Sequence, residues 1–250
     1  MNGWYGPPRN FSYMAEVQPV FDKYCATCHD YGKKGAKELI LAGDRDNTFN
    51  ASYIELWRKK YINPIGAGPA QIQAPFSWGS HSSQIVRRIR KYHKTVVADS
   101  ESFERIVTWI DINAPYYPFY ASAYPDNLAG RSPLNGEQIR RLGELTGINF
   151  RKLENYTRKI GPQISFDRPE LSPCLEKFQD KNDPNYKEAL AIIEAGRESL
   201  RNTPRADMDG FVPCAVDRMR QSKYTKYENA ELRSRNAIRE GRKAYDYRLD

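Results

Sequence analysis

The stretch Val17-Gln18-Pro19-Val20-Phe21-Asp22-Lys23-Tyr24-Cys25-Ala26-Thr27-Cys28-His29 decides how this chain is interpreted. Its last five residues have the spacing Cys-x-x-Cys-His, which is typical of a c-type haem attachment site. There the two thiols form thioethers with the haem vinyl groups, and the adjacent imidazole becomes an axial ligand of the iron. The sequence therefore predicts one covalently attached haem c, held by Cys25, Cys28 and His29.

Two other interpretations of the cysteine pair compete with haem attachment. A redox Cys-x-x-Cys motif normally lies near a βαβ pattern, and no such pattern is visible in this sequence. A tetrahedral zinc site needs two further ligands, usually a second Cys or His pair. The remaining cysteines, Cys174 and Cys214, are far apart in the sequence. Haem attachment is the favoured interpretation, with bare thiols or zinc as the alternatives.

Apolar residues at helical spacing flank the motif on both sides. A first stripe, at i, i+3, i+4 and i+7, predicts a short helix that runs into the motif and consists of Val17, Val20, Phe21 and Tyr24. A second stripe with the same spacing predicts a closing helix and consists of Phe103, Ile106, Val107 and Ile110. Asp99 or Ser100 can cap this second helix, because short polar side chains accept hydrogen bonds from the first backbone amides. We therefore expect residues 11–118 to form a small helical c-type cytochrome domain.

The second axial ligand is sought among the three histidines of the chain, which all fall within residues 11–118. His93 follows an amphipathic run over 82–92 and precedes the closing helix, where single-haem cytochromes usually supply their distal ligand. We therefore expect the iron to be ligated by His29 and His93. His81 is the alternative, either as a ligand or as a hydrogen-bond donor to a haem propionate. Weaker alternatives with sulfur or oxygen donors are Met14, Met208, Met219, Tyr31 and Tyr92.

Three segments together resemble a known family: residues 17–29, residues 77–83 (Ser-Trp-Gly-Ser-His-Ser-Ser) and residues 103–117 (Phe-Glu-Arg-Ile-Val-Thr-Trp-Ile-Asp-Ile-Asn-Ala-Pro-Tyr-Tyr). They are similar to the c-type cytochrome region of large secreted planctomycete proteins, including hydrazine synthase alpha-subunit-like proteins. Residues 173–174 and 205–214 resemble the C-terminal extension of the same family.

The resemblance implies a periplasmic haem protein in which Cys25, Cys28 and His29 match the haem site and His93 matches a distal histidine. Hydrazine synthase alpha subunits are much longer and carry two attachment motifs, whereas this chain has one. That difference favours a haem of the electron-transfer type over hydrazine synthesis.

Residues 119–250 are predicted to form a helical, loop-rich C-terminal extension, so the expected fold class is mainly α. A short helix is predicted over 137–145, another from Pro184 to Leu200 with Asp183 as its cap, and a long charged helix over 215–247. We expect the tyrosines of the long helix to pack on the body or on a partner. Cys174 and Cys214 each follow a proline and are expected to form a disulfide in an oxidising compartment, with two free thiols as the alternative.

The net charge of +8 bears on the partners of the chain. Lys and Arg are spread rather than clustered and no nucleic-acid motif is present, so no nucleic-acid partner is expected. The charge is better suited to steering towards an acidic redox protein or towards other subunits of a complex.

No apolar run is long enough to span a membrane. The first residues lack the apolar region of a signal peptide, yet haem attachment implies export, so we expect a periplasmic or otherwise exported protein in a mature or fragment form.

These patterns favour a single-haem electron-transfer protein, or a subunit of a larger redox assembly, over an enzyme. No hydrolase constellation and no phosphate-binding loop appears in the sequence. Two alternatives remain open. One is the catalytic haem domain of a hydrazine-synthase-like enzyme with an open iron site, and the other is a structural or docking module whose haem organises the fold.

Overall fold

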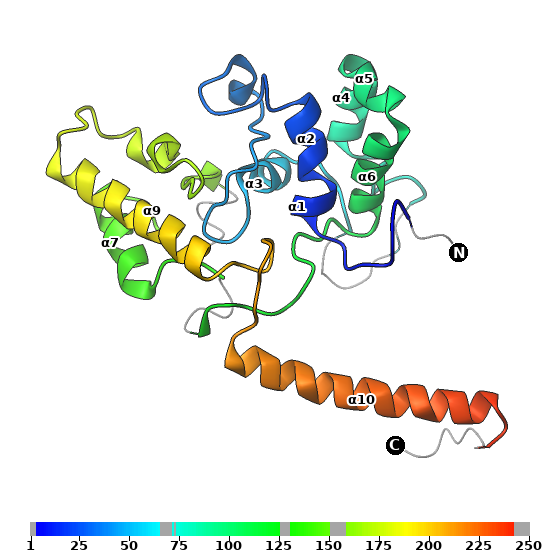
Figure 1. Ribbon diagram of the computed structural model, residues 1–250. Helices are drawn as coiled ribbons and strands as arrows, with labels where there is room; N and C mark the ends of the chain where they lie inside the picture. Colours follow the sequence, from blue (N-terminus) through cyan, green and yellow to red (C-terminus); the bar gives the residue numbers. More distant parts are fainter. Residues whose placement is uncertain (1–3, 66–71, 73, 126–130, 151–158, 243–250) are drawn as a thin grey trace.

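The computed structural model describes residues 4–65, 72, 74–125, 131–150 and 159–242 (Figure 1). Within these ranges the chain is mainly helical, as predicted, and contains no β-strand. Its α-helices are α1 (Tyr13–Glu16), α2 (Gln18–Tyr24), α3 (Ala51–Arg58), α4 (Gln84–Tyr92), α5 (Lys94–Ala98), α6 (Ser100–Asp111), α7 (Gly136–Thr146), α9 (Pro184–Asn202) and α10 (Ala215–Arg239). Short 3-10 helices are η1 (Lys34–Lys37), η4 (Pro169–Leu171) and η5 (Pro173–Leu175).

Capping side chains fix where several helices begin. The Asp99 carboxylate accepts a hydrogen bond from the Ser102 amide at the start of α6, and Asp183 accepts one from the Asn185 amide at the start of α9. Both caps follow the sequence prediction. A third cap was not predicted: the Asn50 side chain accepts from the Tyr53 amide and starts α3. Each cap satisfies a backbone N–H group that has no partner inside the helix.

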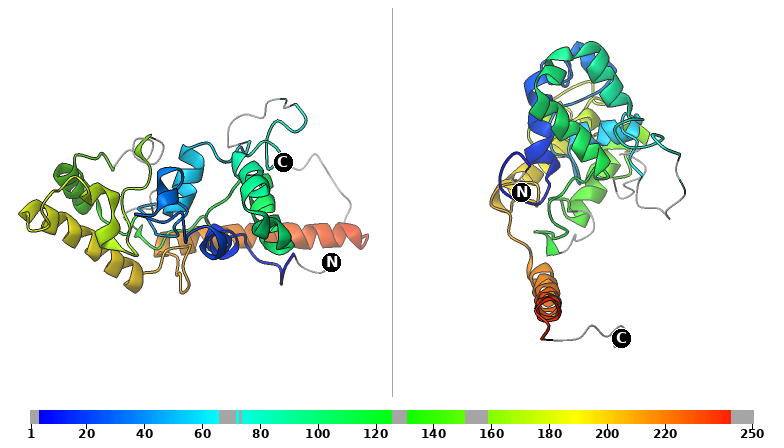
Figure 2. Two further views of the ribbon diagram at one scale, coloured as in Figure 1. Left: turned by 90° about the horizontal axis from the view of Figure 1, so that it is seen from above. Right: turned by 90° about the vertical axis from the view of Figure 1, so that its right-hand side faces the viewer.

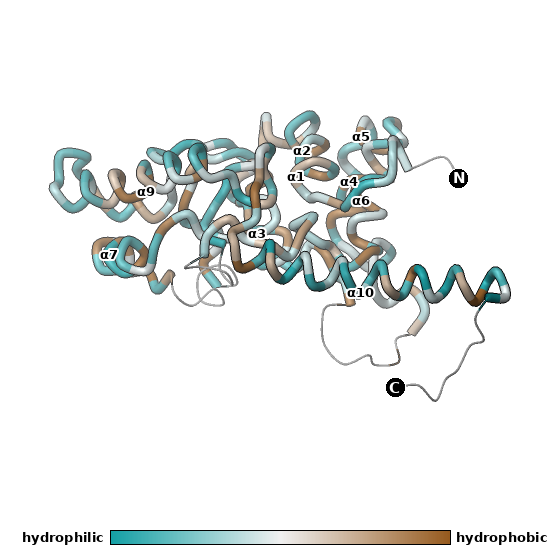
Figure 3. Tube along the Cα trace, turned by 60° about the horizontal axis from the view of Figure 1, so that its bottom comes forward, coloured by the Kyte–Doolittle hydropathy of each residue, from teal (hydrophilic) through white to brown (hydrophobic). Residues whose placement is uncertain are grey.

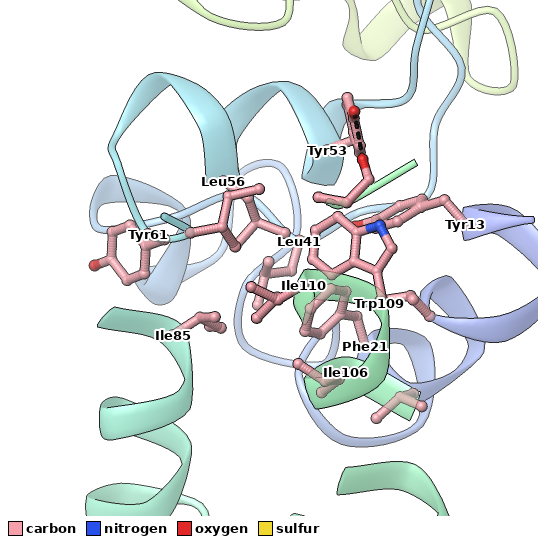
Figure 4. Close-up of a cluster of buried hydrophobic side chains, with 14 of the residues drawn as sticks. Tyr13, Phe21, Leu41, Tyr53, Leu56, Tyr61, Ile85, Ile106, Trp109 and Ile110 are labelled. Atoms are coloured by element: carbon pink, nitrogen blue, oxygen red, sulfur yellow. Dashed lines mark hydrogen bonds between the residues drawn. The ribbon is translucent and has the colours of Figure 1, made fainter. Parts of the chain in front are cut away.

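The first hydrophobic core lies among α1 to α6 (Figure 4). Trp109 of α6 is fully buried at its centre, and its ring centre lies 4.9 Å from that of Tyr13. Tyr13 and Tyr53 meet edge to face at 5.2 Å, and Tyr53 meets Tyr116 at 4.9 Å. Such aromatic pairs add about 0.5–1.5 kcal/mol each beyond their buried area. This cluster ties the segment after α6 to α1 and α3.

A second core is formed by later residues, from Leu134 to Leu200, and α7 packs against α9 within it. Figure 1 shows these two helices side by side, away from α1 to α6. Gly196 of α9 faces Phe166 so closely that a Cβ atom there would lie 2.3 Å from the Phe166 ring. The glycine therefore allows the 160–168 segment to pack directly on α9.

A buried ion pair connects the two parts of the chain. Arg205 and Asp207 are both buried, and Nε of Arg205 donates to Asp207 at 2.8 Å. The Tyr116 hydroxyl, which belongs to the first core, donates to the same carboxylate at 2.8 Å. Arg205 also donates to the backbone carbonyl of Asp46 at 2.8 Å. Each charge is thus paired and hydrogen-bonded, as burial in a protein interior requires.

The structure corrects the prediction of a disulfide between Cys174 and Cys214, since both cysteines are free and buried. The Cys174 amide is held by the carbonyl of Gln163 at 3.1 Å, whereas the Cys214 amide is held by the carbonyl of Ser122 at 2.8 Å. These separate backbone anchors place the two cysteines in different surroundings. A proline before each cysteine carried no information about the distance between them.

The C-terminal helix α10 ends at Arg239, before the predicted end at 247. Tyr245 and Tyr247, which were expected to lie on this helix, fall outside the described residues. The hydropathy-coloured trace in Figure 3 shows hydrophilic residues along most of α10. In the described part of the chain, no helix is both long enough and apolar enough to span a lipid bilayer.

Candidate haem-binding site

The Cys-x-x-Cys-His motif forms a tight turn directly after α2. The Cys25 amide donates to the Phe21 carbonyl at 2.8 Å, and the amides of Cys28 and His29 both donate to the Cys25 carbonyl, at 3.0 and 2.8 Å. Cys25 is buried against the first core, Cys28 is exposed, and neither sulfur is bonded to another. Burial raises the pKa of the Cys25 thiol to about 12. The turn therefore presents two separate thiols and the imidazole within one short segment.

The loop that follows the motif folds back and fixes the His29 ring. Nδ1 of His29 lies 2.9 Å from the carbonyl oxygen of Leu39. A carbonyl can only accept, so Nδ1 carries the proton, and in the neutral ring Nε2 then has the lone pair that can bind a metal. The Gly35 amide donates to the Cys28 carbonyl at 2.9 Å, and the Leu41 amide donates to the His29 carbonyl at 2.8 Å. These backbone hydrogen bonds hold the loop against the turn that carries the His29 ring.

The His93 ring faces the His29 ring. His93 is the residue between α4 and α5, and its amide donates to the Ile89 carbonyl at 2.9 Å, which continues α4 by one residue. The two ring centres are 6.4 Å apart and the ring planes are 70° from parallel. Burial, and then the nearby His29, lower the pKa of His93, so both effects favour its neutral, metal-binding form.

The spacing of the two rings fits a metal held between them. A metal–imidazole nitrogen bond is about 2.0–2.1 Å long, so two imidazoles that shared one metal would have ring centres roughly 6 Å apart. The observed separation is 6.4 Å. With Nδ1 engaged by Leu39, Nε2 of His29 is the nitrogen that would bind a metal, as is usual where a backbone carbonyl orients a metal-bound histidine. The thiols, the tautomer and the ring spacing therefore fit a c-type haem.

His81 lies at the opposite end of α4 from His93. It precedes the helix, is exposed, and packs edge to face on Phe76 with ring centres 4.7 Å apart. The nine residues of α4 span about 13 Å between the two histidines. The structure therefore brings together Cys25, Cys28, His29 and His93, and leaves His81 apart from them.

Four of the other donors considered as iron ligands, the three methionines and Tyr92, are engaged or exposed elsewhere. The sulfur of Met14 accepts from the Asn50 side chain at 3.2 Å, and Met208 packs on the second core. Met219 lies on α10 and is 67% exposed, and Tyr92 is 62% exposed. Tyr31 differs from these four, since its hydroxyl is buried and has no hydrogen-bond partner among the described residues, and its ring lies under the guanidinium of Arg168.

Arg168 clamps the motif from the distant C-terminal part of the chain. Its guanidinium donates to both carboxylate oxygens of Asp30, the residue after His29, at 2.6 and 2.7 Å. The same group donates to Asp44 at 2.8 and 2.5 Å, and Ser165 donates to Asp44 at 2.5 Å. This guanidinium lowers the pKa of Asp30 and keeps its carboxylate charged. Bidentate pairs of this kind fix geometry as well as adding energy.

Sequence reasoning missed the residues that support the histidine pair. Gly35, Leu39 and Arg168 do not belong to the motif, and Arg168 is 138 residues away from Asp30. Leu39 acts through its backbone, so its side chain gives no signal. Only Gly35, in a short run of lysines and glycines, could have indicated a close approach of the backbone.

Comparison of the chain with protein-family models, with curated proteins and with solved structures found no match.

We predict that Gly35→Ala will displace the His29 ring. A Cβ atom at this position would lie 2.6 Å from the Cys28 carbonyl oxygen and 2.9 Å from Cγ and Nδ1 of His29. Because this overpacking involves backbone atoms, the free energy of unfolding should fall by about 1–3 kcal/mol in chemical denaturation. Gly136→Ala is the matched control, since a Cβ atom there meets nothing within 4 Å. Equal stability of the two variants would contradict the role given to Gly35.

We also predict that Arg168→Ala will destabilise the fold more than Arg141→Ala. Removing Arg168 leaves the buried Asp44 carboxylate without its guanidinium, which should lower the free energy of unfolding by about 1–3 kcal/mol. Arg141 forms an equally short bidentate pair with Glu188, but both side chains are exposed, so its loss should change stability little. Denaturation curves for both variants test this order, and a reversed order would refute it.

Proposed function

We propose that this protein is a single-haem c-type cytochrome that transfers electrons, with the iron ligated by His29 and His93. The observation that carries the proposal is the pair of imidazoles that face each other at 6.4 Å, one of them directly after the Cys-x-x-Cys spacing. When bound, haem supplies a one-electron centre whose potential depends on its axial ligands and its burial. Two histidine ligands leave no open coordination position, which favours electron transfer over catalysis at the metal.

The residues of the chain have separate roles in this proposal. Cys25 and Cys28 would anchor the group covalently, because neither sulfur is bonded to another and the two residues have the spacing of the attachment motif. His29 is oriented by the Leu39 carbonyl, and this hydrogen bond makes the ring a stronger electron donor to a metal. The C-terminal end of α4 brings His93 to a position opposite His29. Hydrogen bonds to backbone groups hold both His29 and His93 in place. The positions of the two residues would therefore change little when the site gains or loses an electron.

The proposal extends to the location and the partner of the protein. Attachment of haem to paired cysteines takes place in exported proteins, so we place the protein in the periplasm or an equivalent compartment. Cys28 is exposed, so one edge of the site lies near the surface, where an electron can pass to another protein. The redox partner would be an acidic protein or another subunit, given the net charge of +8.

Expression with haem-attachment machinery tests the proposal directly. The denatured protein should exceed the polypeptide mass by one haem, and a mass equal to the bare chain would refute covalent attachment. The reduced protein should have a low-spin spectrum that carbon monoxide does not change.

We predict that His93→Ala will convert this spectrum to a high-spin one that responds to carbon monoxide, because one axial position is then open. His81→Ala is the matched control and should keep the low-spin spectrum, since His81 lies at the far end of α4. Carbon monoxide binding to the unaltered protein, or a spectrum unchanged by His93→Ala, would contradict the bis-histidine assignment.

A further inference from the structure

Helix α10 has little contact with the rest of the protein. Figure 1 and the right-hand view of Figure 2 show it standing clear of the other helices. Its start is anchored where the Ser122 amide donates to the Asp217 carboxylate at 2.7 Å and the Cys214 amide donates to the Ser122 carbonyl at 2.8 Å. Asp217 is the only buried residue among the 25 of this helix. Helices in proteins take most of their stability from tertiary packing, and α10 has almost none within this chain.

The charge of α10 is high for its length. Seven Lys or Arg residues against three Asp or Glu residues give the helix a net charge of +4. That is half of the net charge of +8, carried by 25 of the 250 residues. The net positive charge is therefore less evenly spread than the sequence analysis assumed, and it is concentrated on the most exposed element.

The acidic residues of α10 and three of its basic residues also lie on different sides of the helix. At 3.6 residues per turn, the three acidic residues Asp217, Glu228 and Glu231 fall within about 60° of one another around the helix axis. This is the side on which Asp217 meets the body. Lys223, Lys226 and Arg233 fall within about 80° of one another, on a side about 160° away from the acidic one. We call the second side, residues 219, 223, 226, 230 and 233, the basic face.

The cations of the basic face have no partners within the described part of the chain. Arg220 pairs with Asp217 and Arg235 pairs with Glu231, so two of the three acidic side chains are already neutralised within the helix. Among the residues that the structure describes, none forms an ion pair or a hydrogen bond with the side chains of Lys223, Lys226 or Arg233. Met219, at the start of the basic face, is 67% exposed. The face therefore combines unpaired positive charge with one exposed apolar side chain.

We propose that the basic face of α10 is a docking surface for an acidic protein. Carboxylates of the partner would meet Lys223, Lys226 and Arg233, while the exposed Met219 would supply apolar contact. Unlike the haem assignment, this inference rests only on α10. Opposite charges on two partners raise the rate of encounter and fix their relative orientation, and an anchored helix that stands out from the body is accessible to such a partner along its length.

Other ligands fit the basic face less well. A helix that lies in a membrane interface buries Trp, Phe or Leu side chains beside its cations, and residues 219 to 233 of this face offer only Met and Ala as apolar side chains. Proteins that bind duplex DNA neutralise roughly 6–10 phosphates, and this face has three cations. A second copy of the chain would have to overcome the repulsion between two molecules that each have a charge of +8.

Binding measurements on the full chain test the docking surface, with poly-L-glutamate as the acidic polypeptide probe. Lys223→Glu/Lys226→Glu should weaken binding about tenfold at low ionic strength, because two charge contacts become repulsive. The matched control is Lys181→Glu/Lys187→Glu, which makes the same change of charge at two exposed lysines elsewhere. Added salt should weaken binding of the unaltered chain, since exposed charges are screened over about 10 Å at 0.1 M. Circular dichroism should confirm that α10 remains helical in both variants.

Any of the following three results would overturn the proposal. An equal loss of binding in both double variants would mean that only net charge matters. Tighter binding to duplex DNA, or to phosphatidylcholine vesicles that contain phosphatidylglycerol, through Lys223 and Lys226 would assign the face to a nucleic acid or a membrane. Dimers in light scattering that the Lys223→Glu/Lys226→Glu variant abolishes would assign it to a second copy. None of these readouts depends on haem, so the result is independent of the proposed electron transfer.

Discussion

The hydrogen bond from Nδ1–H of His29 to the Leu39 carbonyl is the contact on which the candidate site depends. It places the proton on Nδ1 and sets the rotation of the ring, whose centre lies 6.4 Å from that of His93. The loop can make this contact only because its backbone approaches the imidazole closely at Gly35, where no side chain intervenes. A single hydrogen bond contributes about 0.5–1.5 kcal/mol, so the backbone contacts of the loop, rather than this bond alone, hold the geometry.

Two ionic clusters join the C-terminal part of the chain to the first core, and they differ in exposure. Arg168 is partly exposed and meets Asp30 and Asp44 at the edge of the motif. Arg205 and Asp207 are buried under Tyr116. Burying a charge pair has a desolvation cost that can equal its attraction. Such pairs contribute to the specificity of the fold, because each charged group needs a partner with matching geometry. This requirement fixes how the C-terminal part of the chain is oriented on the first core.

Features encoded by neighbouring residues could be predicted from the sequence, and features that depend on distant contacts could not. The helices after Asp99 and Asp183 follow from a cap and an apolar period within a dozen residues. α3 has an equally local signal in its Asn50 cap. The facing of His29 and His93 followed from their places relative to two predicted helices, whereas the clamp by Arg168 joins positions 138 residues apart. The wrong disulfide has the same cause, since local sequence does not report distances in space.

The position of Arg168 has a consequence for the order in which the protein matures. A polypeptide emerges from the ribosome with its N-terminus first, and domains generally fold as units in that order. The thiols of the motif and both histidines lie within the first 93 residues, and Cys25 belongs to the first core. Arg168 is synthesised 75 residues after His93. The growing chain therefore passes through a stage that contains the whole motif and both histidines but not yet the ion pair between Arg168 and Asp30. Before that contact forms, Asp30 and the turn that precedes it are less constrained than in the complete fold.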